Sequence, residues 1–300
     1  MLRPEHLRLI AGHSVRHGIR GGAGLVSLLL TLLLGLVMAT VVISPIEAAQ
    51  KQSGQLSTMS GRDEGETSSK IDMLVKTATV KAIDFAVDPT PEQLSYLVDD
   101  HPSTASAILV LLFLITPLLS CLGGFNQTSG DIGSKGLRYL LFRTERQNIF
   151  LGRFIGTYLF SAAVYLTLFV ILTLYVIAKV HVPGQSAGAM TLWLFSGYLR
   201  LLAFSLPYIA FCSLISCAMS SPFGSLVISL LVAYVFPVVV LIAAGAQPLA
   251  AKLNYLTPWG YKWWLLASPG GLLFPGIAVM LAFSALFVWA GLRHFSKRDL

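Results

Sequence analysis

Long runs of apolar residues dominate the chain, and shorter polar stretches separate them. A hydrocarbon layer about 30 Å thick is crossed by roughly 20 residues of helix, because a helix pairs its own backbone groups in lipid. Six runs are long enough and contain no Asp, Glu, Lys, Arg or His: residues 22–44, 104–123, 154–178, 201–219, 224–246 and 271–292. The pattern predicts an all-α membrane protein with six transmembrane helices.

The basic residues between these runs are unevenly divided. If the N-terminus is cytoplasmic, the inner segments carry twelve Lys and Arg against four Asp and Glu; these segments are 1–21, 124–153, 220–223 and 293–300. The outer segments carry nine against ten. Because cytoplasmic loops concentrate Lys and Arg, both ends of the chain are predicted to be cytoplasmic, in a bacterial inner membrane.

Segment 1–21 predicts a basic amphipathic helix on the cytoplasmic face. Its apolar and small residues recur at helical spacing, with arginines off the stripe. The stripe is Leu7, Ile10, Ala11, Ser14, Val15 and Ile19, and the arginines are Arg8, Arg16 and Arg20. The run 22–44 is too long for the core of a signal peptide, so we interpret it as an uncleaved anchor.

The first outer segment, 45–103, predicts a small helical cap. A helical stripe follows its Ser/Gly/Glu-rich start and comprises Ile71, Leu74, Val75, Ala78, Ala82 and Phe85. A second helix is expected to begin at Thr90, with Pro91 in its first turn and Gln93 completing a capping box.

Aromatic and basic residues mark the other outer segments. In 247–270, Trp259, Trp263 and Trp264 occur with Lys252 and Lys262, which favours interfacial or re-entrant helices over a binding site made by the tryptophans. Segment 179–200 is interpreted as an outer loop with an interfacial part, and Arg200 is placed at its boundary with the next span.

Composition supports the membrane interpretation and narrows the function. The chain is 55% hydrophobic and 12% charged, which excludes a soluble globular surface. Three cysteines, Cys121, Cys212 and Cys217, lie in or beside apolar runs, as small core residues rather than a disulfide framework or a zinc site. The net charge of +7 accompanies no nucleic-acid module, so no nucleic-acid partner is expected.

Two short motifs resemble catalytic signatures, but neither has the required context. GDIGSKG, at 130–136, differs from a Walker phosphate loop because its lysine follows Ser and no strand precedes it. GQSAG, at 184–188 near His181, matches a hydrolase elbow but lies between membrane helices, which favours a simple turn. We expect neither enzymatic activity nor a bound cofactor.

The six runs lack acidic and basic groups, which disfavours an ion-coupled carrier. Their tyrosines and serines form a candidate uncharged translocation path: Tyr158, Tyr165, Tyr208, Ser213, Ser216, Ser229 and Tyr234. The alternative is that these hydroxyl groups hold neighbouring helices together. The sequence leaves both interpretations open.

The inner loop between the second and third runs has an ordered pattern. Asp131 is placed to favour a helix N-terminus, and Leu137, Leu140 and Leu141 form an apolar face. The loop also carries Lys135, Arg138, Arg143, Arg146 and Arg153. This pattern predicts an amphipathic helix along the membrane that offers a docking surface to a cytoplasmic partner; a plain basic loop is the alternative.

These features together resemble the permease subunits of ATP-binding-cassette exporters of the ABC-2 type. Asp131, then 137–141, 143–146 and 151–153, follow the order of the loop after that family's second span, where Glu and Lys are common at the positions of Asp131 and Arg153. The basic ending at 293–300 and the layout of the whole chain are also similar.

The resemblance implies partners rather than a nucleotide site in this chain. It implies a homodimer, or a heterodimer, that docks two ATPase subunits in which ATP and Mg are bound. The coupling helices would comprise Asp131, Lys135, Arg138, Arg143 and Arg146, with Ser220 and Ser221 of the second inner turn. Membrane lipid surrounds such a dimer, and accessory periplasmic proteins remain an open partner class.

Two other functions stay open beside the exporter. One is a motility- or secretion-associated membrane component that has the same fold without moving a solute. The other, less favoured, is an ion-coupled carrier. The substrate is not identified, because drugs, lipids, polysaccharides and peptides all suit an uncharged path.

Overall fold

The chain folds as a set of helices. A computed structural model describes residues 4–20, most of 25–44, scattered positions from 48 to 83, and residues 89–179, 186–244, 252–267 and 271–298. Across these residues the regular structure is helical. Five stretches are long and apolar enough to cross a membrane, which indicates a multi-pass membrane protein: Ser103–Gly133, Arg146–Ala178, Gly188–Ala218, Pro222–Val240 and Leu273–Lys297.

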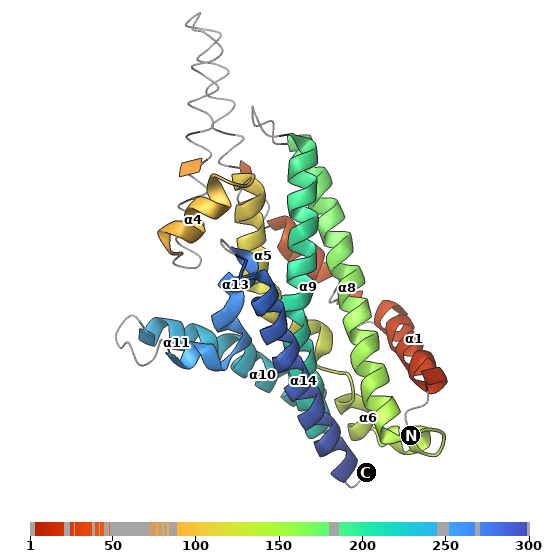
Figure 1. Ribbon diagram of the computed structural model, residues 1–300. Helices are drawn as coiled ribbons and strands as arrows, with labels where there is room; N and C mark the ends of the chain where they lie inside the picture. Colours follow the sequence, from red (N-terminus) through yellow and green to blue (C-terminus); the bar gives the residue numbers. More distant parts are fainter. Residues whose placement is uncertain are drawn as a thin grey trace, which may run out of the picture.

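Four long helices form the bundle: α5 (Ser103–Gly124), α8 (Arg146–Lys179), α9 (Ala187–Ala218) and α14 (Leu273–Lys297). Helix α9 is central, because it packs against the other three. Both chain termini lie at one end of the bundle, here called the terminal end (Figure 1). The opposite end, beside α4 (Pro91–Val98), is called the distal end.

Helix α1 (Pro4–Arg20) confirms the helix expected in 1–21. It lies alongside the start of α8 and runs parallel to it, since Ile10 faces Gly152, Ser14 faces Gly156 and Gly18 faces Phe160. The sequence predicts this helix on the membrane surface, and the structure adds that one side of it packs on α8. Gly152 and Gly156, four residues apart on α8, have no side chains, which allows α1 to approach closely.

The predicted spans agree with the structure to different extents. Residues 104–123 correspond to α5, but α8 begins at Arg146 rather than at 154. The predicted outer loop 179–200 is wrong over residues 187–200, because α9 is one helix from Ala187. Arg200 is therefore inside a candidate span, where its guanidinium Nη1 donates to the carbonyls of Leu265 (3.3 Å) and Leu266 (3.2 Å).

The fifth span, predicted at 224–246, is interrupted. Helix α10 (Pro222–Leu230) leads into a π-helical turn, η1 (Leu231–Val235), and then into α11 (Phe236–Ala244). Pro237 explains the wider turn, since proline has no N–H to donate and its ring clashes with the preceding turn of an α-helix. Beyond it, α11 projects sideways from the bundle (Figure 1).

The first span and the outer cap are described only in part. Within 22–44, residues Leu28–Val37 form a short apolar helix, and Gly35 lies against Leu168 of α8. The capping box of α4 is confirmed: the Gln93 N–H donates to Thr90 Oγ1 (3.4 Å), and the Thr90 N–H donates to Gln93 Oε1 (3.0 Å). The predicted stripe from Ile71 to Phe85 is outside the described residues.

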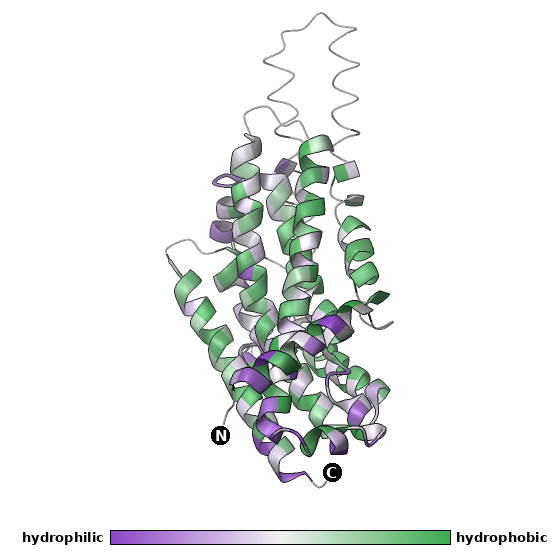
Figure 2. Cartoon of the chain, turned by 90° about the vertical axis from the view of Figure 1, so that its right-hand side faces the viewer, coloured by the Kyte–Doolittle hydropathy of each residue, from purple (hydrophilic) through white to green (hydrophobic). Residues whose placement is uncertain are grey.

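Short helices precede the last span, as predicted for 247–270. They are η2 (Asn254–Leu256), η3 (Pro258–Tyr261) and α13 (Lys262–Leu266), and α13 packs against α5, α9 and α14. Hydrophobic residues cover most of the bundle, whereas hydrophilic residues gather at the terminal end (Figure 2).

The α1–α8 contact predicts opposite effects of the same substitution at two glycines. A Cβ at Gly156 would lie 2.7 Å from the Ala11 carbonyl oxygen, whereas one at Gly12 meets no atom within 4 Å. Gly156→Ala should lower the free energy of unfolding by about 1–3 kcal/mol. Gly12→Ala should leave it unchanged or raise it by up to about 1 kcal/mol. Melting temperatures in detergent would test this, and equal shifts would contradict the packing.

Candidate functional site

The loop expected to form one amphipathic helix forms two shorter ones, so that prediction is wrong. Helix α6 (Ser129–Gly133) and helix α7 (Leu137–Leu141) are separated by a turn in which Lys135 has a positive φ of 58°. A left-handed residue ends an α-helix, and a non-glycine residue adopts this conformation only where its surroundings hold it. The turn changes the direction of the chain before α7.

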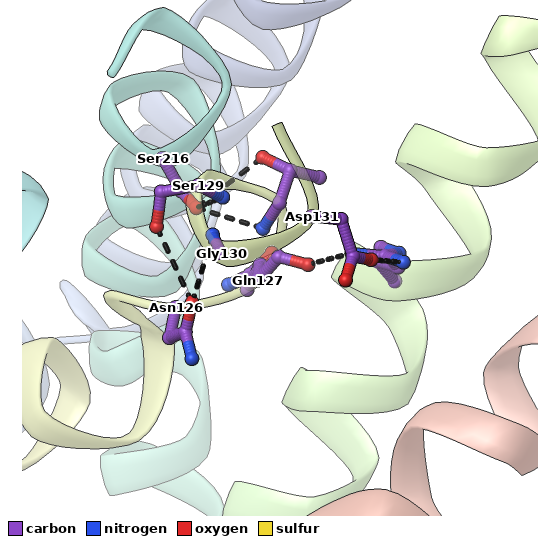
Figure 3. Close-up of polar contacts among 8 residues, drawn as sticks. Asn126, Gln127, Ser129, Gly130, Asp131 and Ser216 are labelled. Atoms are coloured by element: carbon purple, nitrogen blue, oxygen red, sulfur yellow. Dashed lines mark hydrogen bonds and ion pairs between the residues drawn. The ribbon is translucent and has the colours of Figure 1, made fainter. Parts of the chain in front are cut away.

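Ser216 of α9 holds the start of this loop (Figure 3). Its Oγ accepts from the backbone N–H of Thr128 (2.8 Å) and of Ser129 (3.0 Å), and from the Thr128 hydroxyl (3.2 Å). One turn earlier, the Ser213 hydroxyl donates to Gln127 Oε1 (2.5 Å). A single buried hydroxyl thus pairs two N–H groups that begin α6.

Asp131 ties the loop to α8. It forms an ion pair with Arg153, whose guanidinium also donates to the carbonyl of Gln127 (Figure 3). Arg153 is mostly buried and Asp131 partly exposed. The two charges are therefore partnered within the chain, and Asp131 acts on the position of α6 rather than as a free docking carboxylate.

Arg146 ties the loop to the C-terminal end of α14. Its Nη1 donates to the carbonyls of Phe295 (3.3 Å), Ser296 (3.0 Å) and Arg298 (2.6 Å). Arg298 in turn donates to the carbonyl of Cys217 at the end of α9. Because cations are stabilised by carbonyls at a helix C-terminus, Arg146 serves as an internal clamp.

The remaining predicted docking residues lie on the exposed side of the loop. Lys135, Arg138 and Arg143 are exposed. Two aromatic residues lie among them: Tyr139 is 78% exposed and Phe142 is 89% exposed. Leu137 faces inward instead and packs with Ile149, Phe150, Cys217 and Phe295. We call Lys135, Arg138, Tyr139, Phe142 and Arg143 the loop face.

The second predicted docking segment lies beside the first. The Ser220 carbonyl lies so close to Gly133 that a Cβ there would collide with it. Ser221 caps α10 by accepting from the Gly224 N–H at 3.4 Å, while Ser220 is exposed. A groove of about 510 Å³ also opens next to the loop, lined by His6 and by residues of 141–148.

Some hydroxyls of the candidate path residues hydrogen-bond to other parts of the chain, whereas others have no such partner among the described residues. Tyr165 OH lies 3.2 Å from Ser120 Oγ, and Tyr158 OH donates to the Leu202 carbonyl (3.3 Å). Ser213 and Ser216 hold the loop, and Tyr234 is partly exposed. Tyr208 and Ser229 are buried, and their hydroxyls have no hydrogen-bond partner among the described residues.

A polar cluster near the distal end was not predicted as a unit. Trp193 stacks on His101 (ring centroids 3.6 Å apart), donates through Nε1 to Ser106 Oγ (3.0 Å), and lies under Arg200 (4.7 Å). Burial and the nearby Arg200 lower the pKa of His101, and Asp100 opposes them. The only hint of this cluster in the sequence was Arg200, which directly precedes the apolar run 201–219.

Two residues of the short outer helices form a second part of this region. Lys262 Nζ lies 4.9 Å from the ring centroid of Trp259, and both side chains are buried. Burial lowers the pKa of Lys262 from its usual 10.5 to about 8. Trp259 packs near Phe204 of α9, so it is a core residue rather than a surface anchor.

No protein-family model matches the chain, and a search of curated proteins found no match.

Ser216 predicts an effect that a neighbouring serine does not share. Ser216→Ala would leave two buried N–H groups without an acceptor and should cost about 2–5 kcal/mol of unfolding free energy. Ser205 is equally buried, but its hydroxyl donates only to the Leu202 carbonyl of its own helix (2.9 Å), so Ser205→Ala should have little effect. Thermal unfolding, with amide exchange at 128–133, would measure both; similar losses would contradict the role of Ser216.

Lys262 predicts a pH-dependent stability. Its folded pKa of about 8 is below its usual 10.5, so between these values the unfolded state binds more protons and stability rises with pH. Lys262→Met should therefore stabilise the protein below pH 8, by up to about 3 kcal/mol, and the gain should vanish near pH 10.5. Unfolding across pH 7–10 tests this, with exposed Lys252→Met as the control; a constant difference would contradict it.

Proposed function

We propose that this chain is the membrane subunit of an ATP-driven exporter of the ABC-2 type and docks a separate ATPase subunit at its terminal end. The observation that supports this most is the loop face. Tyr139 and Phe142 are 78% and 89% exposed beside three basic residues, at the polar end of an otherwise apolar bundle. Aromatic and arginine side chains are the commonest anchors of protein interfaces.

The charge distribution supports a cytoplasmic location for this face. The terminal end carries Arg138, Arg143, Arg146 and Arg153 from the loop and α8, together with basic residues of α1 and α14. Because Lys and Arg favour the cytoplasmic side, this end would meet cytoplasmic ATP. ATP hydrolysis then takes place in the partner, and the face transmits its movement to the bundle.

The rigid connections behind the face suit such a transmission. Leu137 anchors α7 to a core that includes Phe150 of α8 and Phe295 of α14. Asp131 connects the same loop to α8 and Ser216 connects it to α9, while Arg146, the first residue of α8, connects that helix to the end of α14. A force applied to the loop face would therefore reach three spanning helices at once.

An ion-coupled carrier has less support. The helices α5, α8, α9, α10, α11 and α14 contain no Asp or Glu, so they lack the carboxylates that carry protons in coupled transporters. Arg200 is paired with backbone carbonyls. The substrate of the exporter would move along an uncharged surface that includes the unpaired hydroxyls of Tyr208 and Ser229.

The docking proposal is tested by a double substitution on the loop face. Tyr139→Ser with Phe142→Ser removes both exposed rings and should weaken ATPase binding by about tenfold or more. Its melting temperature should stay unchanged, because neither ring is buried. Gln147→Ala, an exposed position at the same end, is the matched control. The measurement is the ATP hydrolysis that co-purifies with the tagged chain from native membranes.

Further results separate the outcomes. Asp131→Asn should reduce the melting temperature together with association, because its carboxylate acts inside the chain. Phe142→Cys should react with a membrane-impermeant thiol reagent in inverted vesicles, where the cytoplasmic face is accessible, and not in intact cells. Labelling from the outside, or undiminished ATPase recovery in the double variant, would overturn the proposal. Stimulation of hydrolysis by substrate would distinguish an exporter from a motility or secretion component.

A further inference from the structure

Two polar side chains, one from η3 and one from α13, are buried side by side. Lys262 is 5% exposed and Trp259 is 2% exposed, and the ammonium lies 4.9 Å from the indole ring centroid. The Trp259 Nε1–H has no hydrogen-bond acceptor among the described residues. No ion pair of Lys262 is found among the described residues.

A third donor approaches the same short helix. Arg200 reaches the carbonyls of Leu265 and Leu266 through Nη1, while its Nε is buried and has no acceptor among the described residues. Leu266 follows Lys262 by four residues, which is a rise of about 6 Å along a helix. Lys262 and the Trp259 indole N–H therefore lie at the start of α13 and Arg200 at its end, and residues 252–267 contain no Asp or Glu.

Burial without a partner is costly for such groups. Desolvation favours the neutral form of a buried cation. A buried lysine or arginine therefore often marks a functional site. The depressed pKa of Lys262, about 8, still leaves the amine protonated at neutral pH. A bound anion would supply the missing counter-charge and accept from the indole N–H.

The position of α13 indicates where such an anion would come from. The helix packs between α5, α9 and α14 in the distal half of the bundle (Figure 1). Trp263 and Trp264 of α13 and the preceding Tyr261 are partly exposed, which is the aromatic pattern of a membrane–water interface. The phosphate groups of lipids lie at such an interface.

We propose that Lys262, Trp259 and Arg200 bind one phosphate group at the distal membrane interface. A phosphate presents acceptor oxygens in several directions, which suits donors that come from η3, α13 and α9. Lysine and arginine are the usual phosphate partners in proteins, and basic pockets between membrane helices bind lipid headgroups. The phosphate belongs either to an anionic lipid or to a free phosphate ion.

The test measures the melting temperature of the full chain in a non-ionic detergent with three additions. These are dioleoylphosphatidylglycerol, dioleoylglycerol with the same acyl chains but no phosphate, and inorganic phosphate. At a hundredfold excess over Kd, binding should raise the melting temperature by roughly 4–8 °C. A shift with phosphatidylglycerol alone assigns a lipid headgroup, whereas a saturable shift with inorganic phosphate assigns the free ion.

Two variants show whether the shift comes from this site. Lys262→Gln removes the charge and Trp259→Phe removes only the indole N–H, and each should reduce the shift by at least half. Lys252→Gln and Trp263→Phe are the matched controls on the same outer segment and should keep it. If Lys262→Gln fails to fold, slower amine labelling of wild-type Lys262 on addition of the phosphate compound replaces it, with a decrease of threefold or more expected.

Three outcomes would overturn the proposal. They are no shift with either phosphate compound, an equal shift with dioleoylglycerol, and a full shift in both site variants.

Discussion

The hydrocarbon of lipid forms no hydrogen bonds, so a polar group that enters the apolar bundle is stabilised by a partner within the chain. This constraint explains the clearest contacts in the structure. Ser216 accepts two backbone N–H groups, Arg200 finds two carbonyls, and Arg153 finds both a carboxylate and a carbonyl. Each contact joins segments far apart in sequence, so the polar groups organise the packing of an otherwise interchangeable set of apolar helices.

Apolar runs predicted the ends of a helix well where the run itself determines them. They predicted these ends less well where contacts with distant residues extend the helix. α5 begins next to Pro102 and matches 104–123 within one residue at each end. The outer loop predicted at 179–200 was wrong over residues 187–200, because the carbonyls that accept from Arg200 lie at 265 and 266, which the local pattern does not reveal. The capping box at Thr90 was predictable because all its parts lie within four residues.

The candidate site shows the same division. The spacing of charges predicted a candidate site in 131–146, but charge alone did not separate the residues that anchor the loop from those that are exposed. Arg146 and Asp131 turn inward, whereas Arg138 and Arg143 remain exposed, although all four are charged residues of one loop. The turn at Lys135 depends on a backbone angle that no residue type dictates, so the continuous helix could not have been excluded from sequence.

The parallel pairing of α1 with α8 has a consequence for biosynthesis. His6 contacts Thr144 across 138 residues (3.1 Å), so the first helix leaves the ribosome long before its partner exists. At about 5–20 residues per second, this interval is roughly 7–28 s. During that time the apolar stripe of α1 has no protein partner, and the membrane surface is a suitable place to bury it. Its amphipathic character thus serves an early stage, and its small-residue groove on α8 receives it later.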